Sequence, residues 1–171
     1  MQETTFETVT LTAGGEPVEA RYYASPGSPR GAVFVGGVGG GYDTPARELY
    51  PRICDELQTR DVAGLRVRFR DPLDLDSSIE DVLAGLAFLE KEGVRSAALV
   101  GHSFGGAVVV AAAARSDLAR VVITLATQAY GAQEADRLGP RCALVLLHGT
   151  ADRVLPPRAS EWVHSIAADP R

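Results

Sequence analysis

The chain has 171 residues, 46% of them hydrophobic and 23% charged, and a formal net charge of −5. This length fits a single domain, residues 1–171, with one buried core. The Lys and Arg residues are scattered, which argues against a nucleic-acid-binding surface, so small molecules are the expected partners. The apolar residues form short runs, none approaching the roughly twenty residues that cross a membrane. The N-terminus lacks the basic start and apolar stretch of a signal peptide, so we expect a cytoplasmic protein.

Two segments near the N-terminus alternate apolar and polar residues. They are "FETVTL" and "VEARYY", joined by the turn-like "AGGEP", and the pattern predicts an antiparallel hairpin. After "SPGSPRG" the sequence changes to short apolar runs rich in Val, Ala and Leu, which are typical of a parallel sheet buried on both faces. These runs are "AVFVGG", "GLRVRF", "SAALVG", "RVVITLA" and "CALVLLHG".

Helical patterns separate these runs. Thr44 and Pro45 fit the cap and first turn of one helix, and residues 77–80 fit a capping box at the start of another. Residues 105–115 are nearly all Ala and Val, so we expect this helix to lie centrally against the sheet. A last helix follows the proline pair of "PPRASEWVHSIAADP". The apolar positions expected to face the core are Leu49, Ile53 and Leu57, then Ile79, Val82, Leu83, Leu86 and Leu89, and finally Trp162, Val163 and Ile166.

The order of these elements is a hairpin followed by alternating strands and helices. It predicts an α/β three-layer sandwich with a mostly parallel twisted sheet, right-handed crossovers and an antiparallel hairpin at the N-terminus. The link from "TLATQ" to the strand at Cys142 is short and leaves little room for a large lid.

Two groups of residues in the sequence have side chains that can bind metal ions. Cys54 and Cys142 lie in apolar contexts without a partner at CxxC or zinc-finger spacing, so we expect two buried reduced thiols. Asp71, Asp74 and Asp76 lie close together in "RDPLDLDSS", which lacks the Gly and the distal Glu of a calcium loop. We interpret them as a solvated loop that leads into a helix cap, and we expect no metal and no organic cofactor.

The segment "SAALVGHSFGGAVVVAAAA" takes a predicted strand directly into a predicted helix, with Gly101, Ser103 and Gly105 at the joint. So sharp a turn forces the serine toward unusual backbone angles and projects its hydroxyl clear of the sheet, and a Cβ at the glycines would collide with neighbouring elements. The helix N-terminus directs N–H groups at negative charge beside Ser103, so the Phe104 N–H is a candidate oxyanion donor. In the alternative interpretation, Ser103 is only a helix cap.

Two further loops follow predicted strands. "FVGGVGGGYD" has five glycines between Gly36 and Gly41, which let the backbone approach a ligand, and the Val38 N–H is the candidate for a second oxyanion donor. The loop lacks GxGxxG and GK[ST], which argues against phosphate binding, and a flexible loop is the alternative. "HGTADRVLPP" places Asp152 just beyond the last strand, where a carboxylate can orient an imidazole. A turn or capping role is the alternative for Asp152.

With these motifs the chain resembles the α/β-hydrolase superfamily, in particular its small, nearly lidless dienelactone-hydrolase-like and serine-esterase-like members. "GGVGGG" corresponds to the oxyanion loop, "GHSFGG" to the nucleophile elbow and "HGTADRVLPP" to the acid loop. The resemblance implies Ser103 as the nucleophile, Asp152 as the triad acid, and Val38 and Phe104 as the oxyanion N–H donors. Dienelactone hydrolases themselves use a cysteine nucleophile, and this chain has Ser103 at that position.

The catalytic histidine of that superfamily normally follows one more strand after the acid loop. Neither that histidine nor the last strand and helix of the fold has a counterpart in its expected place before Arg171. His102 lies inside the elbow, and we expect its side chain to point away from the serine hydroxyl. His148 ends a strand. We therefore expect structural roles for both histidines. His164 has the right order in the chain but falls within a predicted helix, and it is kept as a candidate base against that geometry.

The sequence therefore predicts a serine hydrolase that cleaves an ester, a thioester or a small amide through an acyl-enzyme on Ser103. A serine without its base is a weak nucleophile, so the alternative is a non-catalytic binding module that keeps the hydrolase cleft. Without a covering strand, "ALVLL" at residues 143–147 would form an edge of the sheet, which predicts homodimerisation or aggregation through that strand.

Overall fold

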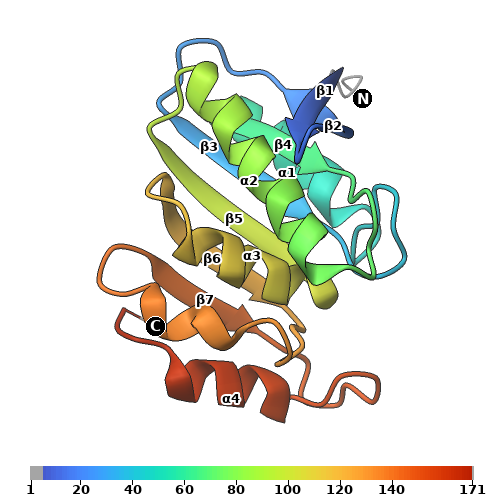
Figure 1. Ribbon diagram of the computed structural model, residues 1–171, viewed down its shortest axis with the longest axis vertical. Helices are drawn as coiled ribbons and strands as arrows, with labels where there is room; N and C mark the ends of the chain where they lie inside the picture. Colours follow the sequence, from blue (N-terminus) through green and yellow to red (C-terminus); the bar gives the residue numbers. More distant parts are fainter. Residues whose placement is uncertain (1–5, 171) are drawn as a thin grey trace.

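The computed structural model describes residues 6–170, which form one seven-stranded sheet with helices on both faces (Figure 1). The strand order is β1-β2-β4-β3-β5-β6-β7. β1 (Glu7–Ala13) and β2 (Glu16–Tyr23) form the expected antiparallel hairpin, and β2 also pairs antiparallel with β4. The remaining neighbours are parallel, as expected, and these strands are β3 (Arg30–Val35), β4 (Ala63–Val67), β5 (Ser96–His102), β6 (Ala119–Leu125) and β7 (Ala143–Leu147).

The helices form two layers around this sheet. α2 (Leu75–Lys91), α3 (Phe104–Ala114) and α4 (Arg158–Ile166) lie in front of it in Figure 1, and α1 (Leu49–Gln58) lies behind it. A 3-10 helix, η1 (Gln133–Arg137), packs against α3 and α4. The prediction of an α/β three-layer sandwich is therefore confirmed.

α3 is buried from its first turn almost to its end. Phe104 and the nine residues after it are all buried, and they are Gly, Ala and Val apart from Phe104. Small side chains on every face let the helix pack closely against β5 and β6 on one side and α2 on another. Because α3 follows β5 after a single residue, Ser103, this packing fixes the position of the joint between strand and helix.

The first two helices begin at different residues from those expected. α1 begins at Leu49 rather than at Pro45, because Ala46, Arg47 and Glu48 have φ of 50°, 52° and 60°, and left-handed residues cannot continue a right-handed helix. Thr44 still binds the first turn of this helix, since its Oγ1 accepts the N–H of Tyr50 at 2.9 Å.

α2 begins at Leu75, ahead of the expected capping box at residues 77–80. The cap is Asp74, whose carboxylate accepts the Ser77 N–H at 3.1 Å. Asp71 accepts the Leu73 N–H at 2.9 Å in the preceding turn, so two of the clustered aspartates organise the loop and cap. Within residues 6–170 no group of three or more His, Cys, Asp or Glu side chains could hold a metal ion.

The last strand is not buried on both faces, as its apolar sequence had suggested. Val145 is 43% exposed and Leu147 is 55% exposed on the side that carries α1. α1 packs on β2 and β4, so this side of β7 is open in the described part of the chain. The opposite side carries Leu144, which is buried beneath the α4 layer.

Less of the β7 edge is open for pairing than the sequence predicted. The Leu144 N–H donates to the carbonyl oxygen of Pro170 at 3.1 Å, so the chain after α4 covers the beginning of the edge. In α4, Val163 is buried as expected. The expectation that Trp162 faces the core is wrong, because Trp162 is 40% exposed and Ser160 is buried.

Cys54 and Cys142 are both buried and free, so the prediction of buried thiols is confirmed. Burial raises the pKa of both thiols. None of the helices in residues 6–170 has the length and apolar character to cross a membrane.

Candidate active site

Ser103 occupies the single-residue joint between β5 and α3. Its φ of 56° and ψ of −118° lie outside the regions that side chains other than glycine normally adopt. The backbone is held on both sides: the Ser103 N–H donates to Leu125 O at 2.9 Å, and the Ser103 carbonyl accepts the Gly106 N–H at 3.0 Å. This is the sharp turn that the sequence predicted, and it lies at the carboxyl end of β5.

The glycines around Ser103 are required by close backbone contacts. A Cβ on Gly101 would collide with the carbonyl of Gly105, and a Cβ on Gly105 would collide with the carbonyl of Gly36. A Cβ on Gly106 would likewise collide with the side chain of Thr127. The structure thus supplies the steric reason for the glycines in "GHSFGG", and it places the loop after β3 directly on the elbow.

The loop after β3 passes beside the serine. A Cβ built on Gly37 would lie 3.3 Å from the Cβ of Ser103. The Gly37 N–H donates to Asp43 Oδ2 at 3.2 Å, and the Arg66 guanidinium donates to the carbonyl of Tyr42 at 2.7 Å. These bonds close the loop on itself and tie it to β4. They leave Val38 at its exposed tip, one residue beyond the contact with Ser103.

The Phe104 N–H is the other expected oxyanion donor. Phe104 is the first residue of α3, where backbone N–H groups have no partner inside the helix. Its ring is buried against Phe69 with the ring centroids 5.9 Å apart. Ser103 directly precedes Phe104, so the positive end of the α3 dipole lies beside Ser103.

Asp152 follows β7, two strands away from β5 in the sheet. Its Oδ1 accepts the N–H groups of Val154 at 2.8 Å and Leu155 at 3.0 Å. These two backbone bonds, with smaller contributions from His148 and His102, lower the pKa of the Asp152 carboxyl group. Asp152 is therefore an ionised group whose second oxygen, Oδ2, forms none of these bonds.

His148 is the imidazole beside Asp152, with Nε2 3.7 Å from Oδ2. That distance is too long for a hydrogen bond. Nε2 lies 2.8 Å from Leu155 O and must donate to it, so in the neutral ring Nδ1 accepts from Ser160 Oγ at 2.6 Å. Both ring nitrogens are occupied, which agrees with the structural role expected for His148.

The other two histidines are placed differently. His102 Nδ1 is buried without a hydrogen-bond partner, close to Gly37. His164 lies on the exposed side of α4, where it lines a surface hollow of about 360 Å³ together with His148, Ser160 and Glu161. α4 begins near the acid loop, so His164, six residues farther along, is about 9 Å from that end. The structure places Ser103, Gly37 and Asp152 at the carboxyl edge of the parallel strands, and it places His164 in a hollow that His148 and Thr150 of the acid loop also line.

Two contacts at this edge involve residues that the sequence analysis did not select. Asp43 accepts the N–H of Gly37, which lies six residues before it in the sequence. Ser160 bonds to Nδ1 of His148, which lies twelve residues before it. Neither spacing belongs to a known motif. Only folding brings these pairs together, so the sequence carried no signal for them.

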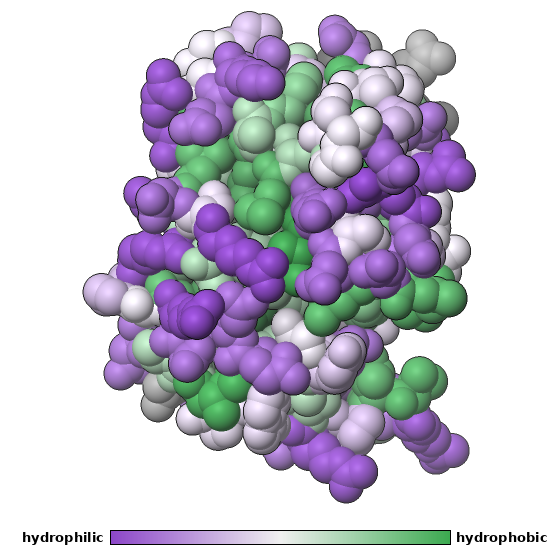
Figure 2. Space-filling model, in the orientation of Figure 1, coloured by the Kyte–Doolittle hydropathy of each residue, from purple (hydrophilic) through white to green (hydrophobic). Residues whose placement is uncertain are grey.

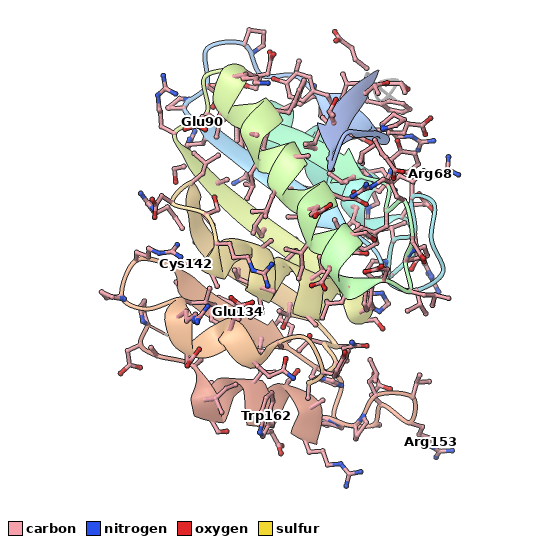
Figure 3. The ribbon with its side chains drawn as sticks, in the orientation of Figure 1. Arg68, Glu90, Glu134, Cys142, Arg153 and Trp162 are labelled. Atoms are coloured by element: carbon pink, nitrogen blue, oxygen red, sulfur yellow. The ribbon has the colours of Figure 1, made fainter. Side chains whose placement is uncertain are left out.

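A pocket of about 440 Å³ opens beside the elbow on the α1 side of the sheet. Its walls come from the segment before α1, from the ends of β5 and β6, and from the end of β7. Two imidazoles, those of His102 and His148, contribute polar atoms. The remaining lining residues are Pro45, Ala46, Leu49, Leu125, Ala126, Leu147 and Gly149. Figure 3 shows that Arg153, in the loop after β7, projects away from the body of the molecule at the same end.

Comparison with solved structures identifies the fold. Dienelactone hydrolase from Anabaena variabilis superimposes with a TM-score of 0.78 at 15% identity, over 95% of this chain and 81% of that chain. An esterase from Pyrococcus furiosus gives 0.76 at 14% identity, over 95% and 77%. The esterase Est1E from Butyrivibrio proteoclasticus gives 0.72 at 18% identity, over 94% and 84%.

These similarities confirm the α/β-hydrolase fold, in a form similar to that of dienelactone hydrolase. At such low identities they describe the fold alone. No protein-family model matches the sequence, and no curated protein matches it. The activity must therefore be argued from the site.

Proposed function

We propose that this chain is a serine hydrolase that cleaves an ester, a thioester or a small amide through an acyl-enzyme on Ser103. The observation that carries the proposal is the conformation of Ser103, with φ of 56° at a joint whose glycines are fixed by backbone contacts. Strain of this kind is kept where it serves function. A helix cap would not need it, and Ser103 makes no side-chain capping bond to α3. The esterases among the similar structures agree with this assignment.

The chemistry follows from the groups around the serine. As Ser103 Oγ bonds to the substrate carbonyl carbon, its proton passes to a base and the carbonyl electron pair becomes an oxyanion. The N–H groups of Phe104 and Val38 would stabilise that oxyanion. Collapse of the intermediate breaks the bond to the leaving group, which takes the proton. Water then attacks the acyl-enzyme by the same steps and releases the acid.

Asp152 would orient the imidazole that acts as the base. Oδ1 of its ionised carboxylate accepts two N–H groups of the loop, and Oδ2 accepts neither of them. His148 does not fill this role because both of its ring nitrogens are occupied. Within residues 6–170, His164 is therefore the candidate for the base.

Intact-mass analysis after exposure to a fluorophosphonate tests the proposal. The nucleophile displaces fluoride and gains the phosphonyl mass, so we expect labelling of the parent chain and none of Ser103→Ala, with circular dichroism confirming that both are folded. Added imidazole should accelerate labelling if the built-in base is missing, and Asp152→Ala should reduce that acceleration. His164→Ala would abolish labelling only if His164 is the base. A folded parent chain that is not labelled, with or without imidazole, would contradict the proposal.

One observation favours the alternative of a non-catalytic binding module. Both ring nitrogens of His148 are already bonded, to Ser160 and to Leu155, so the imidazole nearest Asp152 does not offer Ser103 a proton acceptor. In this case the cleft binds a ligand that it does not turn over. Ligand binding that survives Ser103→Ala, together with an unlabelled Ser103, would establish this alternative.

We further propose that the chain forms a homodimer through β7, whose edge beyond Leu144 and whose exposed Val145 and Leu147 are suited to pairing with a second copy. The cytoplasmic location expected from the sequence stays a prediction. Its support is the pair of buried free thiols, which are typical of a reducing compartment.

A further inference from the structure

Large apolar side chains are exposed mainly in the loops around Ser103. Seven such residues are exposed in the described part of the chain, and four of them lie in loops that follow the parallel strands. Their exposed fractions are 55% for Val38, 79% for Leu73, 71% for Tyr130 and 90% for Val154. We call these four residues the apolar rim. Exposed apolar side chains that gather at one place mark a binding surface more often than isolated ones do.

The order of the strands places the rim on both sides of the nucleophile. Ser103 follows β5, the central one of five parallel strands. Val38 follows β3 and Leu73 follows β4, on one side of β5. Tyr130 follows β6 and Val154 follows β7, on the other side. The carboxyl ends of parallel strands lie at the same edge of a sheet, so on each side of Ser103 two of the loops that carry rim residues leave the sheet.

Contacts link the loops after β3, β4 and β6 to Ser103 or to one another. A Cβ built on Gly37 would lie 3.3 Å from Ser103, and one on Gly40 would lie 3.3 Å from Pro72. On the other side the Gln128 N–H lies 3.4 Å from the Ser103 carbonyl oxygen. A Cβ on Gly131 would touch Leu75 at 3.1 Å, so the loop after β6 reaches the beginning of α2.

Exposed apolar side chains are also visible on the molecular surface (Figure 2). Figure 2 shows apolar side chains projecting at the right-hand edge of the molecule, where Figure 1 places the loops after β3 and β7. The short connection between β6 and β7 holds only η1. The rim therefore lies open to ligands, with no helical lid built from that connection.

The charges near the rim are mostly negative. Asp71 and Asp74 are exposed on either side of Leu73, and Asp152 precedes Val154 by two residues. Arg153 is the basic residue of the acid loop, and it projects away from the body (Figure 3). A carboxylate or phosphate on the substrate would meet acidic groups near Leu73 and again near the reacting centre.

We infer that the substrate is a neutral ester with apolar groups, alkyl or aryl, on both sides of the scissile bond. One group contacts Val38 and Leu73, and the other contacts Tyr130 and Val154. This inference rests on the proposed function, because the rim is assigned relative to Ser103. A lipid surface fits less well, since acidic side chains alternate with the apolar ones and anionic membranes would be repelled.

Binding of an uncleavable ligand tests the inference independently of catalysis. Dibutyl ketone replaces the ester by a carbonyl that cannot be hydrolysed and carries an alkyl chain on each side, and its analogue with a terminal carboxylate in place of one terminal methyl adds one negative charge. Both are titrated into the full chain carrying Ser103→Ala, which excludes addition of the serine to the ketone. Backbone amide spectra report the result. We expect the neutral ketone to shift the amides of Val38, Leu73, Tyr130 and Val154, with an affinity about tenfold higher than that of the carboxylate.

Matched substitutions identify the surface. Val154→Ser removes an apolar side chain from the rim, and Val145→Ser makes the same change on the open face of β7. We expect Val154→Ser to weaken ketone binding about threefold and the triple variant Leu73→Ser/Tyr130→Ser/Val154→Ser to abolish it, while Val145→Ser leaves it unchanged. The rim residues are exposed, so these variants should fold, and thermal unfolding checks that they do.

Three results would overturn the inference. They are equal or tighter binding of the carboxylate, amide shifts confined to the open face of β7, and binding of the chain to neutral phosphatidylcholine vesicles without binding of the ketone. Failure of the proposed function is recognised separately, because fluorophosphonate labelling of Ser103 does not enter this titration. A labelled serine with no ketone binding would reject the substrate class alone. Ketone binding with an unlabelled serine would reject the catalysis alone.

Discussion

Ser103 adopts a backbone conformation that costs a residue other than glycine about 1–3 kcal/mol. Such a conformation persists where the surroundings leave the chain no alternative. Here α3 is buried along nearly its whole length, and Gly101 and Gly105 bring the backbones of β5, α3 and the loop after β3 into direct contact. The rigid packing of three elements therefore holds the backbone of Ser103 in place, and with it the Phe104 N–H that we propose as an oxyanion donor.

Gly105→Ala tests this packing. The added Cβ would collide with the carbonyl of Gly36, which is backbone and cannot rotate away. We expect a loss of about 1–3 kcal/mol in the free energy of unfolding, as for other overpacked cores. Urea denaturation measures it. Gly149→Ala is the matched control, because nothing lies within 4 Å of its Cβ position, and it should change stability little. Equal stability of the two variants would show that the elbow is not tightly packed.

The sequence indicates those candidate site residues whose surroundings are local. Ser103 and its glycines lie within six consecutive residues, and Asp152 lies in the loop that follows β7. Asp43 and Ser160 could not be found in this way, because each meets its partner only through a loop or helix that folds back. The role of His148 likewise depends on Ser160 and Leu155, so its ring could be assigned only from the folded geometry.

At the scale of elements, Arg70 joins the N-terminal hairpin to α2. Its guanidinium bonds Asp81 Oδ1 at 2.6 Å, Glu80 at 3.1 Å, Glu16 at 3.1 Å and the carbonyl of Ala13 at 3.0 Å. The Asp81 side chain is completely buried. Burial raises the pKa of Asp81, and the bonds from Arg70 oppose that rise. The pair therefore orders the segment between β4 and α2, which contains Leu73.

Asp81→Ala should destabilise the fold strongly. The substitution leaves the Arg70 side chain, 16% exposed, without its buried partner, and breaking such a pair costs about 3–5 kcal/mol. Glu80→Ala removes an exposed partner of the same arginine and should cost about 0–1 kcal/mol. Replacing both members, Arg70→Met with Asp81→Leu, should restore much of the stability. Chemical denaturation of the three variants decides this, and similar losses for Asp81→Ala and Glu80→Ala would contradict the argument.

The elements were predictable where the hydrophobic pattern alone decides them. All five parallel strands and α3 occur at the expected apolar runs. The starts of α1 and α2 were not found, because they depend on backbone geometry: a left-handed turn at residues 46–48 delays α1, and Asp74 caps α2 ahead of the residues that fitted a capping box. The exposure of Trp162 was also missed, because Ser160 rather than Trp162 faces His148.

At the scale of the whole molecule, the two faces of the sheet are covered unequally. α2, α3 and α4 cover one face from β1 to β7, whereas α1 packs on the other face against β2, β4 and β3. The remaining surface carries Ile123, Leu125, Val145 and Leu147, two neighbouring pairs in the register of β6 and β7. The sequence could not distinguish this surface from a buried one, because "ALVLL" has the composition of a strand buried on both faces.

This surface and the edge of β7 lead to the last prediction, which concerns association of two copies. The Leu144 N–H is already bonded to Pro170, so a second β7 can pair only with the edge that begins at Leu146. Antiparallel pairing there would extend the sheet across both copies and set the exposed Val145 and Leu147 side chains of the two copies near one another. We therefore expect a dimer that forms with rising protein concentration, measured by sedimentation velocity.

Val145→Lys should abolish this dimer, because a charged side chain beside a sheet edge opposes the approach of a second strand. Val154→Lys makes the same substitution at a loop position that is 90% exposed and away from the edge, so it should leave the dimer intact. Loss of the dimer in both variants would point to net charge rather than to β7. A parent chain that sediments as a monomer at every concentration would mean that the bond from Leu144 to Pro170 closes enough of the edge to prevent pairing.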